Sequence, residues 1–287
     1  MVSIYIIGSV AREANDTLSD KDLLAVGCPT EIESAISRYA SGGWNIAKFS
    51  RPEFEAMASS QSLFVQHVKQ DGQVVRDDQG YLRKVLDSYQ ANQNYYRELA
   101  NAIEPILSLG KLEVGYWGLL FQADILYVAV RNACILHRAT EASPDFDFKR
   151  LVQWVGEMAD LTTSEKESLL RLRSLKHAYR DRSAEADVAE VRDAAKAATK
   201  LAGYWHSLPC STSTDQEPSN GYFDVRALEG QLVRTVGPIY MDELDGNHEL
   251  ADLWGIICNS DPYKPRLEWL SLWSLQVSNF LAKQHYH

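Results

Sequence analysis

The chain has 287 residues, 45% of them hydrophobic, and is therefore long enough for two domains of ordinary size with apolar cores. Its formal net charge of −10 excludes a broadly basic surface, so any nucleic acid must bind in a local basic groove. It has no uninterrupted apolar run of bilayer length, no basic start typical of a secretory signal and no CxxC pair among its four cysteines, so we expect a cytoplasmic protein with reduced cysteines.

The first 78 residues mix strand and helix patterns. Three runs rich in β-branched and aromatic side chains are predicted as strands: Ser3–Ile7, Lys21–Val26 and Trp44–Phe49. Residues 30–40 have helical spacing, because Ile32 and Ile36 fall on one face. Thr30 is the predicted N-cap of that helix. The pattern predicts an α+β domain over residues 1–78.

The periodicity becomes helical from residue 81 onward. Helices are expected over residues 82–108, 116–139, 148–158, 164–182 and 184–208. Residues 79–208 are therefore predicted to form an all-α helical bundle. Ser, Thr, Pro, Asp and Gly then concentrate in residues 209–221, which are predicted as a linker. Helical spacing returns in residues 223–235, 249–258 and 266–284, so residues 209–287 are assigned to a linker and a helical C-terminal extension.

A Gly-Ser pair follows the first predicted strand and an Asp-x-Asp pattern opens the second. Gly8 and Ser9 begin a predicted helix, where backbone N–H groups and a hydroxyl suit a triphosphate, and Arg12 adds a cation. Asp20 and Asp22 stand two residues apart on a strand, so they project from the same face with Cα atoms about 6.6 Å apart. Two carboxylates so placed can bridge two Mg²⁺ ions about 3.5–4 Å apart, or Mn²⁺ in their place.

Together the two halves of this pattern resemble the minimal nucleotidyltransferases of the DNA polymerase β superfamily, of the kanamycin nucleotidyltransferase type. The resemblance covers about residues 1–78. It implies a polymerase-β-like fold and a Mg²⁺-dependent transfer of a nucleoside monophosphate from a nucleoside triphosphate to a hydroxyl acceptor. Asp20 and Asp22 are then the catalytic metal ligands, and Gly8, Ser9 and Arg12 contact the nucleotide.

The sequence departs from that family at the position of a third carboxylate. The family commonly places an acid on the next core strand, where this chain has Asn45. An amide can coordinate a cation through its carbonyl oxygen, but it adds no charge and cannot act as a base. This departure leaves three interpretations open: a slower enzyme, an acid supplied from elsewhere in the chain, and a domain that only binds nucleotide.

Two patterns in the helical region carry basic side chains. Arg131 and His137 resemble the Arg and His pair of HEPN domains, which implies an RNase site; the alternative is a histidine that closes a helix end as a cation. Arg173, Lys176 and Arg180 fall on one helical face and predict a groove for a triphosphate or a single strand. The alternative for this cluster is a solvated face neutralised by nearby acids.

Tyr286 is next to last in the sequence and offers a phenol as a hydroxyl acceptor. With the domain order, it resembles the nucleotidyltransferases of Hailong antiphage defence systems, which make short DNA oligomers primed on a tyrosine near their own C-terminus. That resemblance implies a short single-stranded product and a membrane effector downstream, and we also consider a homo-oligomer. The alternative for Tyr286 is an ordinary terminal residue.

Two other functions remain open. One is a toxin–antitoxin protein in which the nucleotidyltransferase half modifies a protein tyrosine by AMPylation and the HEPN-like half is an RNase. The other is a catalytically silent nucleotide sensor, which the missing third acid favours.

Overall fold

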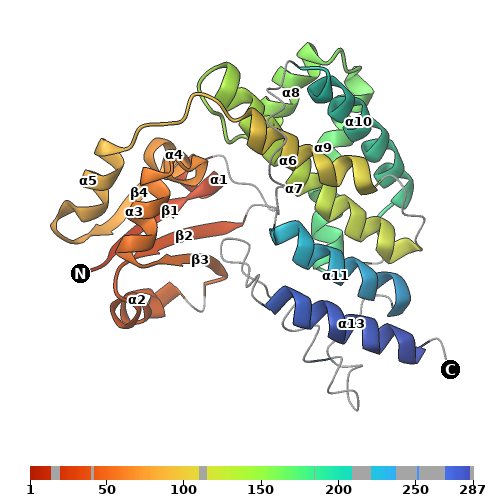
Figure 1. The fold of residues 1–287 in the computed structure, drawn as a ribbon. Helices are drawn as coiled ribbons and strands as arrows, with labels where there is room; N and C mark the ends of the chain where they lie inside the picture. The colour runs from red at the N-terminus through yellow and green to blue at the C-terminus, as the bar shows by residue number, and fades with distance from the viewer. Residues whose placement is uncertain are drawn as a thin grey trace. The chain divides into compact units, whose positions relative to one another are not determined.

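The computed structural model describes residues 1–13, 20–39, 42–109, 115–183, 185–208, 221–236, 251 and 269–284. The protein is α+β, with a four-stranded mixed sheet near the N-terminus followed by a helical region (Figure 1). The chain divides into two compact units, Met1–Asn94 and Tyr95–His287.

The sheet of the first unit contains the three predicted strands with the predicted bounds. They are β1 (Ser3–Ile7), β2 (Lys21–Val26) and β3 (Trp44–Phe49), and the sheet order is β3-β2-β1-β4. β1 is antiparallel to β2 and β4, whereas β2 and β3 are parallel. The sequence did not predict β4 (Gln73–Asp77), because this edge strand is largely exposed and shows no apolar alternation.

Helices cover both faces of the sheet. On one face, Leu23 and Ala25 of β2 share a core with Ile32 and Ile36 of α2 (Pro29–Ile36). The prediction of Thr30 as the N-cap was wrong: the cap is Cys28, and Pro29 occupies the first helical position, where its fixed φ and missing N–H are tolerated. A single 3₁₀ turn, η1 (Ser37–Tyr39), continues from the end of α2.

The opposite face of the sheet packs against three helices. They are α3 (Arg51–Ser59), α4 (Leu63–Asp71) and α5 (Tyr81–Ser88). Residues 82–108 do not form the single predicted helix, because Leu82 and Leu86 belong to the core beneath the sheet and α5 ends at Ser88. The side chain of Asn92 then accepts hydrogen bonds from the N–H groups of Gln93 and Asn94, which competes with helix formation. The first compact unit therefore extends past residue 78 to Asn94.

The second unit is a helical bundle around α7 (Tyr116–Glu141). α7 packs against α6 (Tyr96–Leu109), α8 (Phe148–Met158), α9 (Thr163–Arg180), α10 (Val188–His206) and α11 (Gly221–Val236), and α13 (Leu270–Gln284) packs against α11. By length and composition α7 is apolar enough to cross a bilayer, but 67% of its apolar window is buried within the protein. Its composition is therefore that of the core helix of this bundle.

The structure describes only part of the predicted linker and C-terminal extension, residues 209–287. α11 agrees with the helix expected over residues 223–235, and α13 accounts for residues 270–284 of the helix expected over residues 266–284. Residues 209–220, most of residues 249–258, and Tyr286 lie outside the described residues.

Candidate functional site

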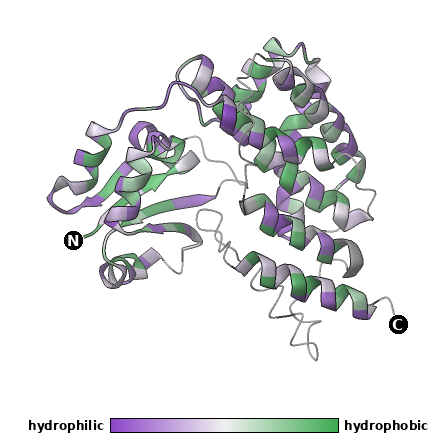
Figure 2. Ribbon diagram, viewed as in Figure 1, coloured by the Kyte–Doolittle hydropathy of each residue, from purple (hydrophilic) through white to green (hydrophobic). Residues whose placement is uncertain are grey.

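The candidate carboxylates lie at the end of the sheet where β1 ends and β2 and β3 begin. The antiparallel register pairs Ile7 with Asp22, and the parallel register pairs Asp22 with Asn45. Alternate residues share a face of a strand, so Asp22 and Asn45 project from the same face as the buried Leu24, and Asp20 comes directly before Lys21, the first residue of β2. Figure 2 shows this end of β2 as hydrophilic, in contrast to the rest of the strand.

Asn45, at the position where a third acid was expected, contacts Asp22 directly. Asn45 Nδ2 donates a hydrogen bond of 3.4 Å to Asp22 Oδ1. Asp22 is half-buried, whereas Asp20 and Asn45 are exposed. The amide therefore orients the central carboxylate of the site without adding a negative charge to it.

Gly8 connects the two halves of the sequence pattern. Its φ is +77°, and a Cβ placed there would lie 2.9 Å from Asp22 Oδ2. A side chain at this position would meet both a steric clash with the carboxylate and an unfavourable backbone conformation. Glycine thus allows the chain leaving β1 to pass directly beside Asp22.

The helix that follows Gly8 is only one turn long. α1 spans Gly8–Ala11 and has no side-chain cap at its N-terminus, and Ser9 within it is half-buried. One turn aligns few peptide dipoles, so α1 alone gives little electrostatic support for a triphosphate. The predicted role of Gly8 therefore depends on its proximity to Asp22 rather than on a helix terminus.

Arg12, expected to contact the nucleotide, lies in an internal ion pair. Its Nη1 donates to Asp71 Oδ2 at 2.9 Å and lies 3.2 Å from His67 Nε2, which in turn lies 3.4 Å from Asp71 Oδ2. The side chains of Arg12, His67 and Asp71 are only 16%, 12% and 9% exposed. This arrangement ties the end of α1 to α4, and Gln73 Nε2 adds a bond of 2.6 Å to the Ala11 carbonyl oxygen.

Asp71 keeps its charge despite its burial. Burial raises the pKa of this carboxyl, but hydrogen bonds from His67 and Arg12 outweigh it, and the pKa lies below its ordinary value. Sequence reasoning missed both His67 and Asp71. The available signal was their i,i+4 spacing, which places them on one face of α4.

The second unit buries the residue expected to act as the HEPN histidine. His137 is 0% exposed, accepts a hydrogen bond from Trp205 Nε1 at Nδ1 (3.2 Å), and packs against the ring of Trp154. Burial lowers its pKa. Arg131 lies six residues earlier on α7, which is about 240° around a helix axis. These positions argue against an Arg131–His137 RNase site and also against a solvated cation at a helix end.

The basic face of α9 is largely engaged in contacts within the bundle. Arg180 donates to the buried Asp124 at 2.7 Å, and Lys176 lies 5.2 Å above the ring of Tyr127. Arg173 is half-buried. Nearby acids therefore neutralise part of the cluster, in line with the alternative interpretation of a charge-balanced face.

A buried ionic network joins this face to α11. Asp124 also accepts from Arg226, which donates in turn to Glu229. The hydroxyl of Tyr179 donates to Glu229 at 2.6 Å. Opposite charges thus fix α11 to α7 and α9, and sequence periodicity gave no sign of this network.

The donor set of the candidate site suits Mg²⁺. Within the described ranges, no group of three or more His, Cys, Asp or Glu side chains is placed to hold a metal ion. Mg²⁺ needs hard oxygen ligands and is usually held by one or two carboxylates together with substrate phosphates and water. Asp20 and Asp22 supply two carboxylates, so these residues fit the ion.

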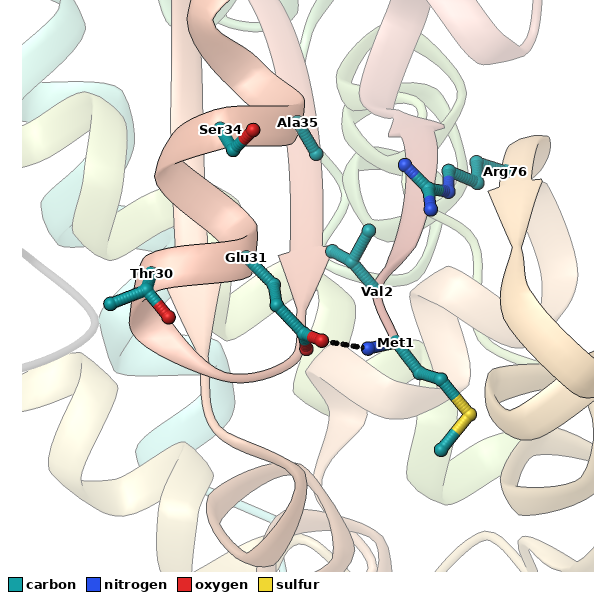
Figure 3. Close-up of a pocket in the computed structure, with 7 residues that line it drawn as sticks. All are labelled: Met1, Val2, Thr30, Glu31, Ser34, Ala35 and Arg76. Carbon is teal, nitrogen blue, oxygen red and sulfur yellow. Dashed lines mark ion pairs between the residues drawn. The ribbon is translucent and has the colours of Figure 1, made fainter.

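A cavity of about 270 Å³ lies at the other end of the sheet. Its lining consists of Met1, Val2, Thr30, Glu31, Ser34, Ala35 and Arg76, with an ion pair between Met1 and Glu31 (Figure 3). The strand register runs from Ser3 opposite Val26 to Ile7 opposite Asp22, a span of about 13 Å. The cavity is therefore separate from the candidate carboxylates.

Comparisons of the chain with models of protein families, with curated proteins and with solved structures found no match.

Proposed function

We propose that the first unit is a nucleotidyltransferase domain of the polymerase β type, which transfers a nucleoside monophosphate from a (d)NTP to a hydroxyl acceptor and releases pyrophosphate. The observation that supports this proposal is the placement of Asp22 against Gly8 and Asn45 at one end of the sheet. The placement joins both halves of the sequence pattern in space.

The residues of the site have distinct roles in this proposal. Asp20 and Asp22 would hold Mg²⁺, which supplies charge neutralisation for the triphosphate and activation of the acceptor hydroxyl. Asn45 orients Asp22 through its amide. Gly8 leaves room for the carboxylate, and the Arg12–Asp71 pair holds the turn that carries Gly8.

Labelled nucleotides test the proposal directly. The 287-residue chain is incubated with α-labelled NTPs and dNTPs and Mg²⁺, and the products are separated on a gel. A ladder supports oligonucleotide synthesis, a single protein label supports AMPylation, and nucleotide binding without product supports a silent sensor. Asp22→Asn and Asp20→Asn should abolish product formation. Asp87→Asn, an exposed carboxylate on α5, is the matched control and should keep it.

The silent sensor is the second candidate, and Asn45 is the observation that favours it. Asn45→Asp places a carboxylate at the third-acid position beside Asp22. A slow enzyme should gain turnover from this substitution, because a third ligand adds negative charge for the metal. A domain that binds nucleotide but is inactive for a reason other than the missing acid should remain inactive both as the wild type and as the Asn45→Asp variant.

The oligonucleotide product and its primer belong to the same proposal. We assign Tyr286 as the acceptor of the first nucleotide in a cytoplasmic antiphage system, with a membrane effector downstream, on the basis of the sequence resemblance alone. Intact-mass spectrometry after incubation with each dNTP should show added nucleotide masses that disappear in Tyr286→Phe. Tyr96→Phe, which removes a phenol that donates to Glu141, is the control. Equal labelling of wild type and Tyr286→Phe would exclude self-priming and leave nucleotidyl transfer intact.

A further inference from the structure

Aromatic and basic side chains gather at the end of the sheet that carries Asp22, on its opposite face. Trp44 is the first residue of β3 and pairs in register with Lys21, which lies between Asp20 and Asp22 in the sequence. Tyr39 closes the 3₁₀ turn after α2, and Arg38 precedes it. We call Lys21, Arg38, Tyr39 and Trp44 the edge platform, because β3 is an edge strand of the sheet.

The platform is held together by ring contacts. The rings of Tyr39 and Trp44 meet edge to face, with centroids 5.7 Å apart. The Arg38 guanidinium lies 4.8 Å from the centroid of the Tyr39 ring, and its Nη2 donates to the Tyr39 hydroxyl at 2.8 Å. A Cβ on Gly42 would lie 2.9 Å from Trp44 Cδ1, so glycine lets the chain pass against the indole ring.

Exposure and charge distinguish the platform from a structural aromatic pair. Tyr39 and Trp44 are only half-buried, whereas Lys21 and Arg38 are exposed. Within the described part of the chain, neither cation forms an ion pair with an acid, although the protein has a net charge of −10. Lys48, which lies on β3 with Trp44, is in contrast paired with Glu33 at 2.7 Å. Two exposed cations beside half-exposed rings match a phosphate joined to a base.

We propose that the edge platform binds a nucleotide unit, with the base against Tyr39 and Trp44 and the phosphate against Lys21 and Arg38. The inference rests on the proposed function, because a nucleotide bound here lies at the sheet end that carries the carboxylates. Stacking on an aromatic ring accepts every base, so the site is expected to bind with little sequence preference. The bound unit belongs either to a growing or acceptor strand or to the incoming nucleotide.

Binding without turnover tests the platform separately from catalysis. Fluorescence anisotropy of the 287-residue chain is measured in EDTA with a labelled octathymidylate and, in a second arm, with a labelled dTTP analogue. Tyr39→Leu and Trp44→Leu keep apolar volume but remove a stacking ring, and each should weaken binding at least fivefold. Tyr81→Leu is the control, because Tyr81 forms the same type of stack with Arg51, at 4.3 Å, outside the platform.

Salt dependence gives a second readout that does not depend on the packing of the rings. Lys21→Gln and Arg38→Gln should each reduce the slope of log K against log salt by about 0.7, the value for one lost phosphate contact on a single strand. Lys48→Gln, on β3, should leave the slope unchanged. Losses confined to the oligonucleotide arm identify a strand site, and losses confined to the dTTP arm identify a site for the incoming base.

The two proposals fail in different ways. Wild-type affinity and salt slope in all four platform variants, in both arms, would overturn the platform even if nucleotide transfer is observed. Weakened binding in these variants together with no transfer by the wild-type protein would support the platform and contradict the proposed enzymatic function.

Discussion

Replacing Gly8 with alanine tests whether the approach of the chain to Asp22 determines activity. The φ of +77° at Gly8 makes any other residue unfavourable by roughly 1–2 kcal/mol. The added Cβ would also lie 2.9 Å from Asp22 Oδ2, so the turn or the carboxylate must move by roughly 0.5 Å or more to reach an ordinary contact distance. Because a displacement of about 1 Å at reacting groups can cost about 100-fold in rate, we expect kcat to fall by about 10- to 100-fold.

Gly80→Ala separates the contact from the backbone penalty. Gly80 has a φ of +62°, but a Cβ there meets no atom within 4 Å. Urea unfolding should therefore show a loss of about 1–2 kcal/mol for both variants, whereas pyrophosphate release should fall only for Gly8→Ala. The reasoning is refuted if Gly8→Ala keeps the kcat of the wild type, or if Gly80→Ala loses as much activity as Gly8→Ala.

Three substitutions test the buried polar contacts by urea unfolding. Asp71→Asn removes the counter-charge of Arg12 and should lower the free energy of unfolding by about 1–3 kcal/mol at pH 7. Because the pKa of Asp71 is lowered in the folded protein, this difference from the wild type should vanish as the pH falls through that pKa. A difference that stays constant with pH would contradict the reasoning. His137→Gln removes an imidazole whose pKa is lowered by burial. As the pH falls below about 6.5, the free energy of unfolding of the wild type should therefore decrease more steeply than that of the variant, by at most ~1.4 kcal/mol per pH unit. Equal pH dependence of the two proteins would refute this. Asp124→Asn removes one carboxylate from the buried Arg226, which keeps its ion pair with Glu229, and should cost about 1–3 kcal/mol, whereas an unchanged midpoint would show that the network does not stabilise α11.

The sequence predicted the local structure well where one face of an element is buried. The bounds of β1, β2 and β3 follow from apolar residues that the sheet core requires. β4 was missed because an exposed edge strand carries no such pattern. The predicted helix over residues 82–108 failed for another reason: helical spacing does not show that Leu82 packs beneath the sheet while later residues belong to a different unit.

The candidate site was predictable only as far as it is local in sequence. The spacing of Asp20 and Asp22 placed both on one face, and strand adjacency brought Asn45 beside Asp22. Arg12 could not be assigned, because its partner Asp71 is 59 residues away and single-sequence patterns do not report such pairs. The burial of His137 depends likewise on Trp205, which α10 brings to α7.

The most direct test of the central claim is the release of pyrophosphate from (d)NTPs in the presence of Mg²⁺. The wild-type protein and Asp87→Asn should release pyrophosphate at similar rates, and Asp22→Asn should release none above background while unfolding at a similar urea concentration. Undiminished release by a folded Asp22→Asn variant would contradict the assignment of Asp20 and Asp22 to the catalytic centre.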